Sequence, residues 1–552
     1  MYSEFNQRFN QISKSLLFTI ITILFFNQSS FSQTINVGGA ITSNTIWNFD
    51  TVKIVSDVLV DTNVTLTIKP GTFVEAQGYY KIEVMGKIVA IGNSVDSIVF
   101  SVNDTNRFWS DSLSTSGGWN GIFFIGVQGQ QSSSEFKYCK FEFGKKYGLY
   151  GGNNSGGAVH SMNYHKLSFS HCLFINNRAI CHTIGAKGAK GGAIYCQNNN
   201  EVVIDSCNFL RNNSFYTGGG INIEEGCSLV IISNNTFKFN KAKYYVVNSQ
   251  MINQGGSGTA IYCADNVHSP DIFNNYCYNN VGVNGIIYSS NRKAKIYNNV
   301  ICNNSGAGIF IGHTLSESKV FNNTIANNIC FKGAISNTSR KVKLFNNIIW
   351  GNENNLGANN DQIYNLHTGS GNIIRNNCVE YGPVGDSSIF SNPEFINPTL
   401  GVGPQFNGSS ANWELEDWSP CINSGTSDTN GVVIPKKDAL GMNRVIGSKV
   451  DIGAFENQNI INSSIEVENN QIRFSMFPNP ANSIVNIKLI SENSETINQI
   501  CIYDTKGQLV YQKNSPVGYS SQINISEWPT GLYFVKIGLE NDIIKRLKLI
   551  VY

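Results

Sequence analysis

The sequence predicts an all-β protein in which a right-handed parallel β-helix solenoid is followed by a small antiparallel β-sandwich domain. The main observation is a phrase built on an Asn-Asn pair, which returns every 24 residues at Asn274, Asn298, Asn322 and Asn346. A fixed period in the twenties is typical of a solenoid, in which each coil buries its apolar face only against its neighbours. Apolar and polar residues alternate within each copy, which indicates short strands and not helices.

Stacked coils would place the first asparagine of each pair directly above the next one. Side-chain amides in such a column hydrogen-bond to one another as an asparagine ladder. We therefore expect Asn274, Asn298, Asn322 and Asn346 to form this ladder. Its role would be structural.

The composition agrees with a repetitive β-structure. Charged residues make up 14% of the 552 residues, below the roughly 25% usual for globular proteins, and there are 52 glycines. A Gly-rich turn before an apolar strand, as in Gly156-Gly-Ala-Val159 and Gly191-Gly-Ala-Ile194, is a second landmark of the coil. The net charge of +2 and the lack of a charged tail give no support to a nucleic-acid partner.

The N-terminus has the pattern of a secretory signal peptide over residues 1–32. Arg8 and Lys14 accompany an apolar run, Leu16 to Phe26, that is too short to span a membrane. Ser30-Phe31-Ser32 supplies the small residues of a cleavage site. No later segment resembles a membrane span, so we expect an exported mature chain without a transmembrane segment.

Thirteen cysteines in an exported chain would normally indicate disulfides. Here Cys172, Cys207, Cys277 and Cys302 occupy apolar positions shortly before an Asn-rich turn. We interpret them as small buried hydrophobic residues. No pair has the Cys-x-x-Cys spacing, so the sequence shows no metal site and no evident cofactor.

The repeat covers about twelve coils, and its opening strands are expected at Val52–Val60, Val64–Ile68 and Lys81–Met85. Later segments lose the repeat, and a cap is expected because an open β edge invites aggregation. The chain therefore divides into a signal peptide (1–32), a parallel β-helix (33–380), a cap of the solenoid (381–456), a linker (457–472) and a separate β-sandwich domain (473–552).

Three connections between an Asn-Asn landmark and the next Gly turn are long: Arg178 to Lys190, Lys241 to Gln254, and Glu353 to about Ser370. All three fall at the same point of the coil, so they should leave the solenoid along one edge. Repeat proteins commonly build a binding face from insertions confined to one edge. Exposed loops are also simply tolerated there, so both interpretations stay open.

Four segments follow one another in the C-terminal domain: Phe477-Pro-Asn-Pro-Ala481, Ile502-Tyr-Asp-Thr-Lys-Gly-Gln508, Trp528-Pro-Thr-Gly-Leu-Tyr-Phe-Val535 and Lys545-Arg-Leu-Lys-Leu-Ile-Val551. In these segments the domain resembles the C-terminal sorting domain of proteins exported by the type IX (Por) secretion system of Bacteroidota. The resemblance implies interaction with the outer-membrane secretion machinery and removal of the domain near the linker. Surface attachment or release would follow.

The central repeats and the distal segments Asn392-Pro-Glu-Phe395, Ser419-Pro-Cys-Ile-Asn-Ser-Gly425 and Asp451-Ile-Gly-Ala-Phe-Glu456 resemble the pectate-lyase-like superfamily of parallel β-helices. This superfamily contains lyases, hydrolases, adhesins and proteins of unknown role. The resemblance therefore implies the fold and leaves the activity open.

An enzyme that cleaves acidic polysaccharide on this fold needs clustered carboxylates. A hydrolase uses them to protonate the leaving group and activate water, and a lyase uses them to hold calcium beside a basic residue. Between Gly156 and Asn352 there are only seven acidic residues, and no two recur at one register on adjacent coils. Catalytic residues stay unassigned, and calcium is expected only if the protein is a lyase.

A column of side chains follows the buried Ile or Val of each Gly turn: His160, Tyr195, Asn222, Tyr262, Tyr288, Phe310 and Ser336. Period-two alternation points them outward on one face. Aromatic rings lined up in this way could bind sugar rings, and Tyr244 and Tyr245 of a long connection could extend the surface. The same rings could instead stabilise the exposed sheet by stacking on one another.

A second column is formed by Lys295, Lys319 and Lys343, which precede successive Asn pairs by three residues, with Asp271 beside them. Lysines in register repel one another unless an anion bridges them. The column therefore predicts either a track for an anionic polysaccharide or a solvated surface that keeps the solenoid soluble.

Taken together, these patterns predict an exported cell-surface or secreted β-helix protein that binds or adheres to polysaccharide along the aromatic column. A polysaccharide lyase or glycoside hydrolase on the same fold is one alternative. A passive structural stalk is another. The scarcity of acidic residues in register favours the binding protein and the stalk over the enzyme.

Overall fold

The computed structural model describes residues 33–459 and 472–552 except 113, 149–153, 182–187, 243–255, 355–361, 366–370, 383–384, 429–430, 432, 492–495, 506–507 and 540–543. The predicted signal peptide, at 1–32, lies outside the described residues, as does most of the predicted linker. The chain forms two compact units, Met1–Gln458 and Asn459–Tyr552. Among the residues that the structure describes, no helix has the length and hydrophobicity needed to cross a membrane.

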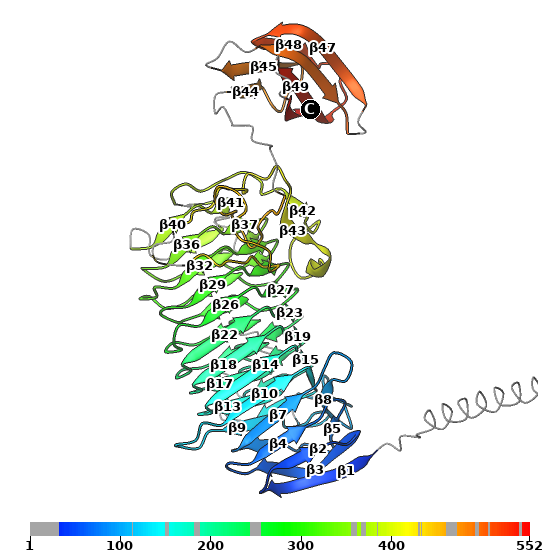
Figure 1. Ribbon diagram of the computed structural model, residues 1–552, viewed down its shortest axis with the longest axis vertical. Coiled ribbons are helices and arrows are strands. Elements are labelled where there is room, and N and C mark those ends of the chain that lie inside the picture. The colour runs from blue at the N-terminus through cyan, green and yellow to red at the C-terminus, as the bar shows by residue number, and fades with distance from the viewer. Residues whose placement is uncertain are drawn as a thin grey trace, which may run out of the picture. The chain divides into compact units, whose positions relative to one another are not determined.

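The first unit is a parallel β-helix, which confirms the predicted fold class (Figure 1). Its first face is a parallel sheet of twelve strands, in agreement with about twelve coils. The strands of this face are β2 (Thr45–Trp47), β4 (Thr65–Ile68), β7 (Lys87–Ile91), β10 (Ser133–Lys137), β14 (Lys166–Ser170), β18 (Glu201–Asp205), β22 (Leu229–Ser233), β26 (Asp271–Phe273), β29 (Lys295–Tyr297), β32 (Lys319–Phe321), β36 (Lys343–Phe345) and β40 (Ile373–Arg375).

Two further faces complete each coil, and the long strands β1 (Thr34–Ile41) and β3 (Thr51–Val60) start both of them. The second face contains β5 (Phe73–Ala76), β8 (Ile98–Val102), β11 (Cys139–Glu142), β15 (Leu173–Ile175), β19 (Asn208–Leu210), β23 (Thr236–Lys238), β27 (Tyr276–Tyr278), β30 (Val300–Cys302), β33 (Thr324–Ala326), β37 (Ile348–Trp350) and β41 (Cys378–Val379). The third face contains β6 (Ile82–Val84), β9 (Ile122–Ile125), β13 (Val159–Met162), β17 (Ile194–Gln197), β21 (Ile221–Ile223), β25 (Ile261–Cys263), β28 (Ile287–Ser289), β31 (Ile309–Ile311), β35 (Ile335–Asn337) and β39 (Ile363–Asn365).

Short strands between the second and third faces mark the edge from which the long connections leave. They are β12 (Lys145–Gly148), β16 (Arg178–Cys181), β20 (Asn213–Ser214), β24 (Lys241–Ala242), β34 (Ile329–Cys330) and β38 (Glu353–Asn354). The three predicted long connections begin with β16, β24 and β38, so they do leave at one edge. The prediction that the third connection continues to about Ser370 is wrong, because it contains strand β39 of the third face.

The interior is filled by the inward residue of every strand, as alternation requires. Phe141, Phe174, Phe209 and Phe237 stack on successive coils with ring centroids 4.7, 4.8 and 4.7 Å apart. All four rings are 0% exposed. This dry interior, continuous from coil to coil, is what a single repeat could not form alone.

The asparagine ladder exists, but the second asparagine of each pair forms it. Asn275, Asn299, Asn323 and Asn347 are fully buried, and each Nδ2 donates to the Oδ1 of the next ladder residue at 2.9–3.0 Å. A second ladder at the next corner joins Asn177, Asn212, Asn240, Asn280, Asn304, Asn328 and Asn352.

The predicted ladder residues Asn274, Asn298, Asn322 and Asn346 are therefore wrong by one position. Each has a φ of 52–55°. Asparagine tolerates this left-handed conformation well, and here it forms the corner between two faces. The corner turns the first side chain away from the interior and the second one into it.

All thirteen cysteines are buried, as the sequence predicted for Cys172, Cys207, Cys277 and Cys302, although their surroundings differ. Cys139, Cys172 and Cys207 occupy the ladder position on three earlier coils, where the Cys172 amide donates to the Cys207 thiol at 3.4 Å. The Cys207 amide in turn donates to Asn235 Oδ1 at 2.8 Å. Cys302 points outward and is buried under the cap, next to Trp413.

The segment predicted as a cap does more than follow the last coil. Its elements β42 (Phe395–Asn397), the 3-10 helix η1 (Gly408–Ser410) and β43 (Asn412–Leu415) belong to a segment that lies against the outer side of the second face. Asn298 and Asn346 donate to the carbonyls of Lys437 and Thr426, at 2.9 and 3.0 Å. Asn298 and Asn346 therefore hold the cap, whereas Asn274 donates to Asn234 Oδ1 of the preceding coil at 3.0 Å.

The second unit is a small antiparallel sandwich, as predicted. One sheet contains β44 (Ile472–Phe477), β45 (Ile484–Ser491) and β48 (Ser520–Asn524), and the other contains β46 (Ile497–Tyr503), β47 (Leu509–Gly518), β49 (Gly531–Leu539) and β50 (Ile544–Val551). An apolar cluster that includes Val485, Ile500, Val535 and Leu549 lies between them.

Candidate functional site: the aromatic column of the third face

The outward side chains predicted for the third face do stand in one register. Strand pairing aligns Phe123, His160, Tyr195, Asn222, Tyr262, Tyr288, Phe310, Ser336 and Tyr364 on successive coils. Their neighbours on each strand, such as Ile194 and Cys196, point into the core and are 0% exposed. The alternation of the sequence thus placed this aromatic column on the correct side of the sheet.

The early part of the aromatic column is covered and does not present a surface for sugars. His160 and Tyr195 are only 3% and 7% exposed. The His160 ring lies between Phe123 and Tyr195, at centroid distances of 5.1 and 4.9 Å, and its Nδ1 is 2.8 Å from the Ser155 carbonyl. Burial lowers the His160 pKa to about 4, so this imidazole is neutral.

The aromatic rings also stack face to face on one another. Tyr262 and Tyr288 stack at 5.0 Å with an interplanar angle of 12°, and Tyr288 and Phe310 stack at 4.9 Å with an angle of 10°. A ring stacked on both sides shows only its edge to solvent. The interpretation that the rings stabilise the sheet therefore describes Tyr288, and a sugar could reach an aromatic face only where the stack is interrupted.

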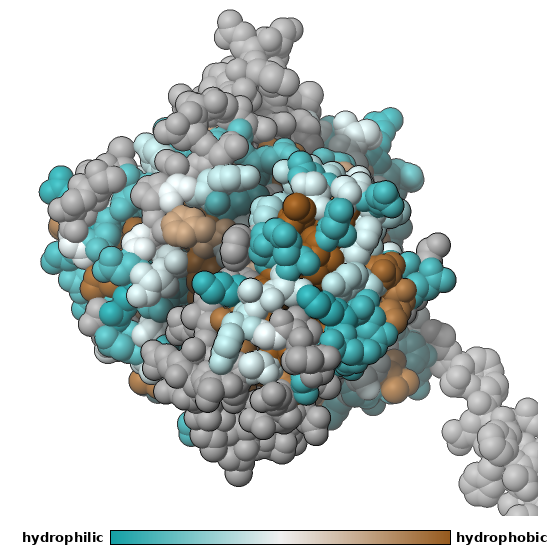
Figure 2. Space-filling view, turned by 90° about the horizontal axis from the view of Figure 1, so that it is seen from above, coloured by the Kyte–Doolittle hydropathy of each residue, from teal (hydrophilic) through white to brown (hydrophobic). Residues whose placement is uncertain are grey.

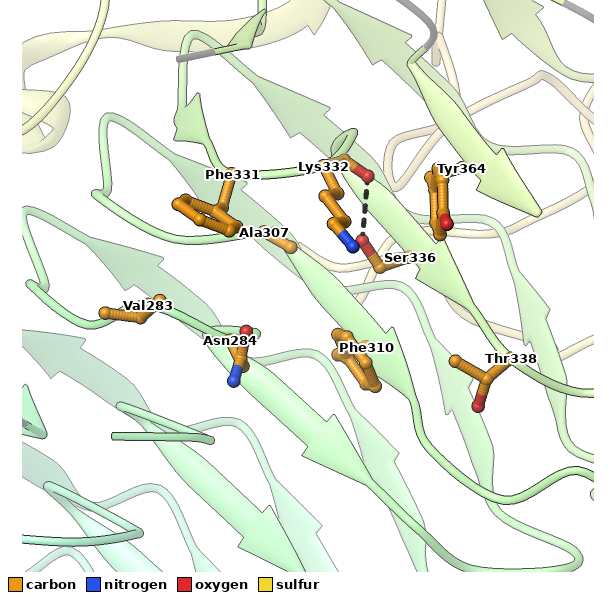
Figure 3. Close-up of a pocket in the computed structure, with 9 residues that line it drawn as sticks. All are labelled: Val283, Asn284, Ala307, Phe310, Phe331, Lys332, Ser336, Thr338 and Tyr364. Carbon is orange, nitrogen blue, oxygen red and sulfur yellow. Dashed lines mark hydrogen bonds between the residues drawn. The ribbon is translucent and has the colours of Figure 1, made fainter. Parts of the chain in front are cut away.

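Such an interruption occurs at Ser336, whose side chain is too small to continue the stack. Phe310 lies on β31 and Tyr364 on β39, with β35 and Ser336 between them (Figure 3). Two strand spacings separate these positions by roughly 10 Å. Because carbon atoms contact an aromatic face at about 3.5–4.0 Å, this gap accepts one saturated ring as a layer.

A pocket of about 260 Å³ opens at this interruption. We call it the Ser336 slot. Figure 3 shows its lining, which comprises Val283, Asn284, Ala307, Phe310, Phe331, Lys332, Ser336, Thr338 and Tyr364. Apolar side chains with a few hydroxyl, amide and ammonium groups are the usual lining of a small-molecule site.

The only charged side chain of this lining is Lys332. Its Nζ lies 5.4 Å from the centroid of the Tyr364 ring, and its backbone carbonyl accepts a hydrogen bond from Ser336 Oγ at 2.9 Å. Among the residues that the structure describes, no carboxylate lines the slot. Lys332 therefore gives this lining a positive charge.

The lysine column of the first face is in register as predicted. Lys295, Lys319 and Lys343 pair in sequence, with Asp271 before them. Lys295 forms an ion pair with Asp271 at 3.1 Å, and Lys319 Nζ donates to the Gly431 carbonyl of the cap at 3.2 Å. Partial burial and the two neighbouring lysines lower the Lys319 pKa. The cap thus occupies part of the column, which weakens the case for a continuous polyanion track.

The acidic residues of the repeat are dispersed, and several of them lie next to basic side chains. Glu201, Glu224, Asp265 and Glu317 lie next to Lys166, Lys190, His313 and Lys341, at 2.8, 2.7, 3.5 and 3.5 Å respectively. Within the described part of the chain, no group of three or more His, Cys, Asp and Glu side chains could hold a metal ion.

Two sequence expectations about the site need comment. Tyr244 and Tyr245 lie outside the described residues, so nothing connects them with the column. The sequence pattern did not predict Tyr364 as a member of the column. Gln362 replaces the usual small residue before Ile363, so no Gly-rich turn precedes this strand. The Ile-Tyr pair itself, which also occurs at Ile194-Tyr195, was the available signal.

Exposed apolar side chains are scattered over the residues that the structure describes. Seen from above in Figure 2, hydrophobic residues form small separate groups among hydrophilic ones. Many of the exposed apolar side chains, such as Leu400 and Val433, belong to the cap segment. Scattered apolar residues of this kind are normal on a protein surface.

Comparison with known families identifies the second unit. Residues 475–552 match the family model of the secretion system C-terminal sorting domain. The comparison with curated proteins finds no match for the chain. The protein is therefore a parallel β-helix carrying a type IX sorting domain, which directs its export to the cell surface or the extracellular space.

Proposed function

We propose that this exported β-helix protein binds polysaccharide at the Ser336 slot, with one sugar ring held between Phe310 and Tyr364. The observation that carries the proposal is the pocket at the interruption of the aromatic column between Phe310 and Tyr364. The interruption at Asn222 is 0% exposed. A pyranose ring has apolar C–H faces that suit aromatic faces on both sides. A bound pyranose ring would take the place of the missing aromatic ring in the column.

The neighbouring polar groups support a preference for acidic sugars. Lys332 supplies an ammonium group beside the slot, while Asn284, Ser336 and Thr338 supply hydrogen-bonding groups for sugar hydroxyls. A uronate carboxylate near Lys332 would gain a charge-assisted hydrogen bond. The slot opens where Phe331 and Lys332 are exposed, while Ser336 is only 2% exposed.

The direct test is to fill the slot. In Ser336→Phe, the new ring would complete the stack from Phe310 to Tyr364, so the fold should persist while the ligand space disappears. We expect at least a tenfold loss of retention in affinity electrophoresis through gels that contain a polyuronate. Ser336→Ala is the matched control, because it leaves the slot open and should retain binding within about twofold.

Two additional measurements distinguish acidic from neutral ligands and binding from cleavage. Lys332→Met should weaken binding to polyuronates more than binding to neutral glucans or mannans, because it removes the cation and leaves the rings. Unsaturated products or new reducing ends would show that the protein is a lyase or hydrolase instead. Equal retention of Ser336→Phe and the unmodified protein would contradict the slot.

A further inference from the structure

Two buried cysteines connect the last coil with the cap. Cys378 begins β41, the last strand of the second face, and Cys421 lies in the cap segment. Both are 0% exposed and belong to one apolar cluster, together with Ile348 and Ile452. The neighbouring Cys421 thiol and burial raise the pKa of the Cys378 thiol, which donates to the Ser391 carbonyl at 3.3 Å. Two parts of the chain that are far apart in sequence therefore place two buried cysteines in one apolar cluster.

The cysteines of the solenoid interior have a different arrangement. Cys139, Cys172 and Cys207 come from three successive coils and act in the ladder position, where the Cys172 amide donates to a neighbouring thiol and the Cys172 thiol donates to backbone carbonyls. Their strands are already held together by strand pairing on both sides. A covalent bond there would add little, whereas the cap meets β41 through a single parallel bridge, between Cys378 and Ile389, among the residues that the structure describes.

We propose that Cys378 and Cys421 form a disulfide in the exported protein and that this bond fastens the cap to the last coil. The export that the sorting domain directs takes the chain out of the reducing cytoplasm, where such bonds rarely persist. Each thiol loses a proton and the pair loses two electrons. A disulfide of a thiol–disulfide oxidoreductase takes up these electrons through a mixed disulfide and becomes two thiols.

The crosslink would act on the part of the solenoid that has no following coil. It joins positions 43 residues apart (421 minus 378), and both β42 and β43 lie within the closed loop. Closing a loop of this length restricts the unfolded chain and so favours the folded cap. The bond would keep the cap over the last coil when the protein works outside the cell.

Mass spectrometry of the full-length exported protein tests the bond. The protein is alkylated with iodoacetamide in denaturant without reductant and digested after glutamate, because Glu380 and Glu394 lie between the two cysteines. We expect peptides containing Cys378 and Cys421 to be recovered as one linked species that reductant separates. Alkylation of both cysteines without reductant would overturn the proposal.

Cysteine-to-serine variants test whether the disulfide stabilises the cap. Reductant should lower the unfolding temperature of the unmodified protein by several degrees and should not affect Cys378→Ser or Cys421→Ser. Cys330→Ser is the matched control, since Cys330 is equally buried and should leave both the linked species and the response to reductant unchanged. If Cys378→Ser still responds to reductant as the unmodified protein does, the assigned pair is wrong.

Discussion

Replacing Asn299 by alanine is expected to lower the free energy of unfolding of the β-helix by about 3–5 kcal/mol, because the buried ladder loses a member that makes five hydrogen bonds. Asn299 Oδ1 accepts from the amide and the Nδ2 of Asn275, both at 3.0 Å. Its Nδ2 donates to Asn323 Oδ1 and to the carbonyls of Ile272 and Tyr297, also at 3.0 Å.

The size of this effect follows from what alanine leaves behind. The Asn275 amide then loses its acceptor, and Asn275 Nδ2 keeps only the Ile232 carbonyl for its two N–H groups. Each buried N–H left without an acceptor costs about 1–3 kcal/mol. Water cannot replace the lost amide easily, since Asn299 is 0% exposed. Urea denaturation followed by circular dichroism measures the change.

The neighbouring asparagine provides the matched control. Asn298 has a φ of 52°, which glycine adopts without strain, and its side chain donates a hydrogen bond to the Lys437 carbonyl. Asn298→Gly should therefore cost only about 1 kcal/mol. The reverse order of the two variants would restore the first asparagine of the pair as the ladder residue.

The periodic features of this chain could be predicted from its sequence, whereas the backbone geometry at the corners of its coils could not. The 24-residue phrase repeats along the chain, so the solenoid and the lysine register follow from counting. Which asparagine of a pair faces inward depends on one left-handed residue at the corner. Asn298 and Asn299 are the same residue type side by side, so periodicity alone cannot distinguish them.

The candidate site also combines features that the sequence predicts with features that it does not. The outward direction of Tyr288 and Phe310 follows from alternation within a strand. The burial of His160 depends on the chain around Ser155, and the gap at Ser336 depends on Tyr364 of the next coil. Contacts between segments that no repeat relates were not available from the sequence.

Replacement of Arg444 by methionine should destabilise the cap strongly and in a pH-dependent way. Arg444 is 0% exposed, and its guanidinium donates to the Gly453 carbonyl and lies 4.0 Å from Glu456. In the orientation that satisfies both groups, the Asn322 amide oxygen also accepts from Arg444 Nε at 3.1 Å. Removing one partner of a buried ion pair typically costs about 3–5 kcal/mol.

The pH dependence comes from the Glu456 carboxyl group. Burial and the neighbouring Asp451 carboxylate raise the pKa of Glu456 from 4.5 to about 7, despite the attraction of Arg444. A raised carboxyl pKa means that the folded cap binds a proton which the unfolded chain has already lost. This contribution to stability is complete below pH 4.5 and is lost as pH rises through 7, by up to about 3 kcal/mol.

Arg444→Met should therefore lose more stability at pH 8, where Glu456 is charged and has lost its cation, than at pH 5, where it is protonated. Hydrogen exchange of the amides in residues 438–457, followed by mass spectrometry at both pH values, measures the opening of the cap directly. Glu456→Gln is the control, and its cap stability should vary much less between pH 5 and 8. An equal loss for Arg444→Met at both pH values would mean that the guanidinium acts through packing and hydrogen bonds to backbone carbonyls, and not through charge.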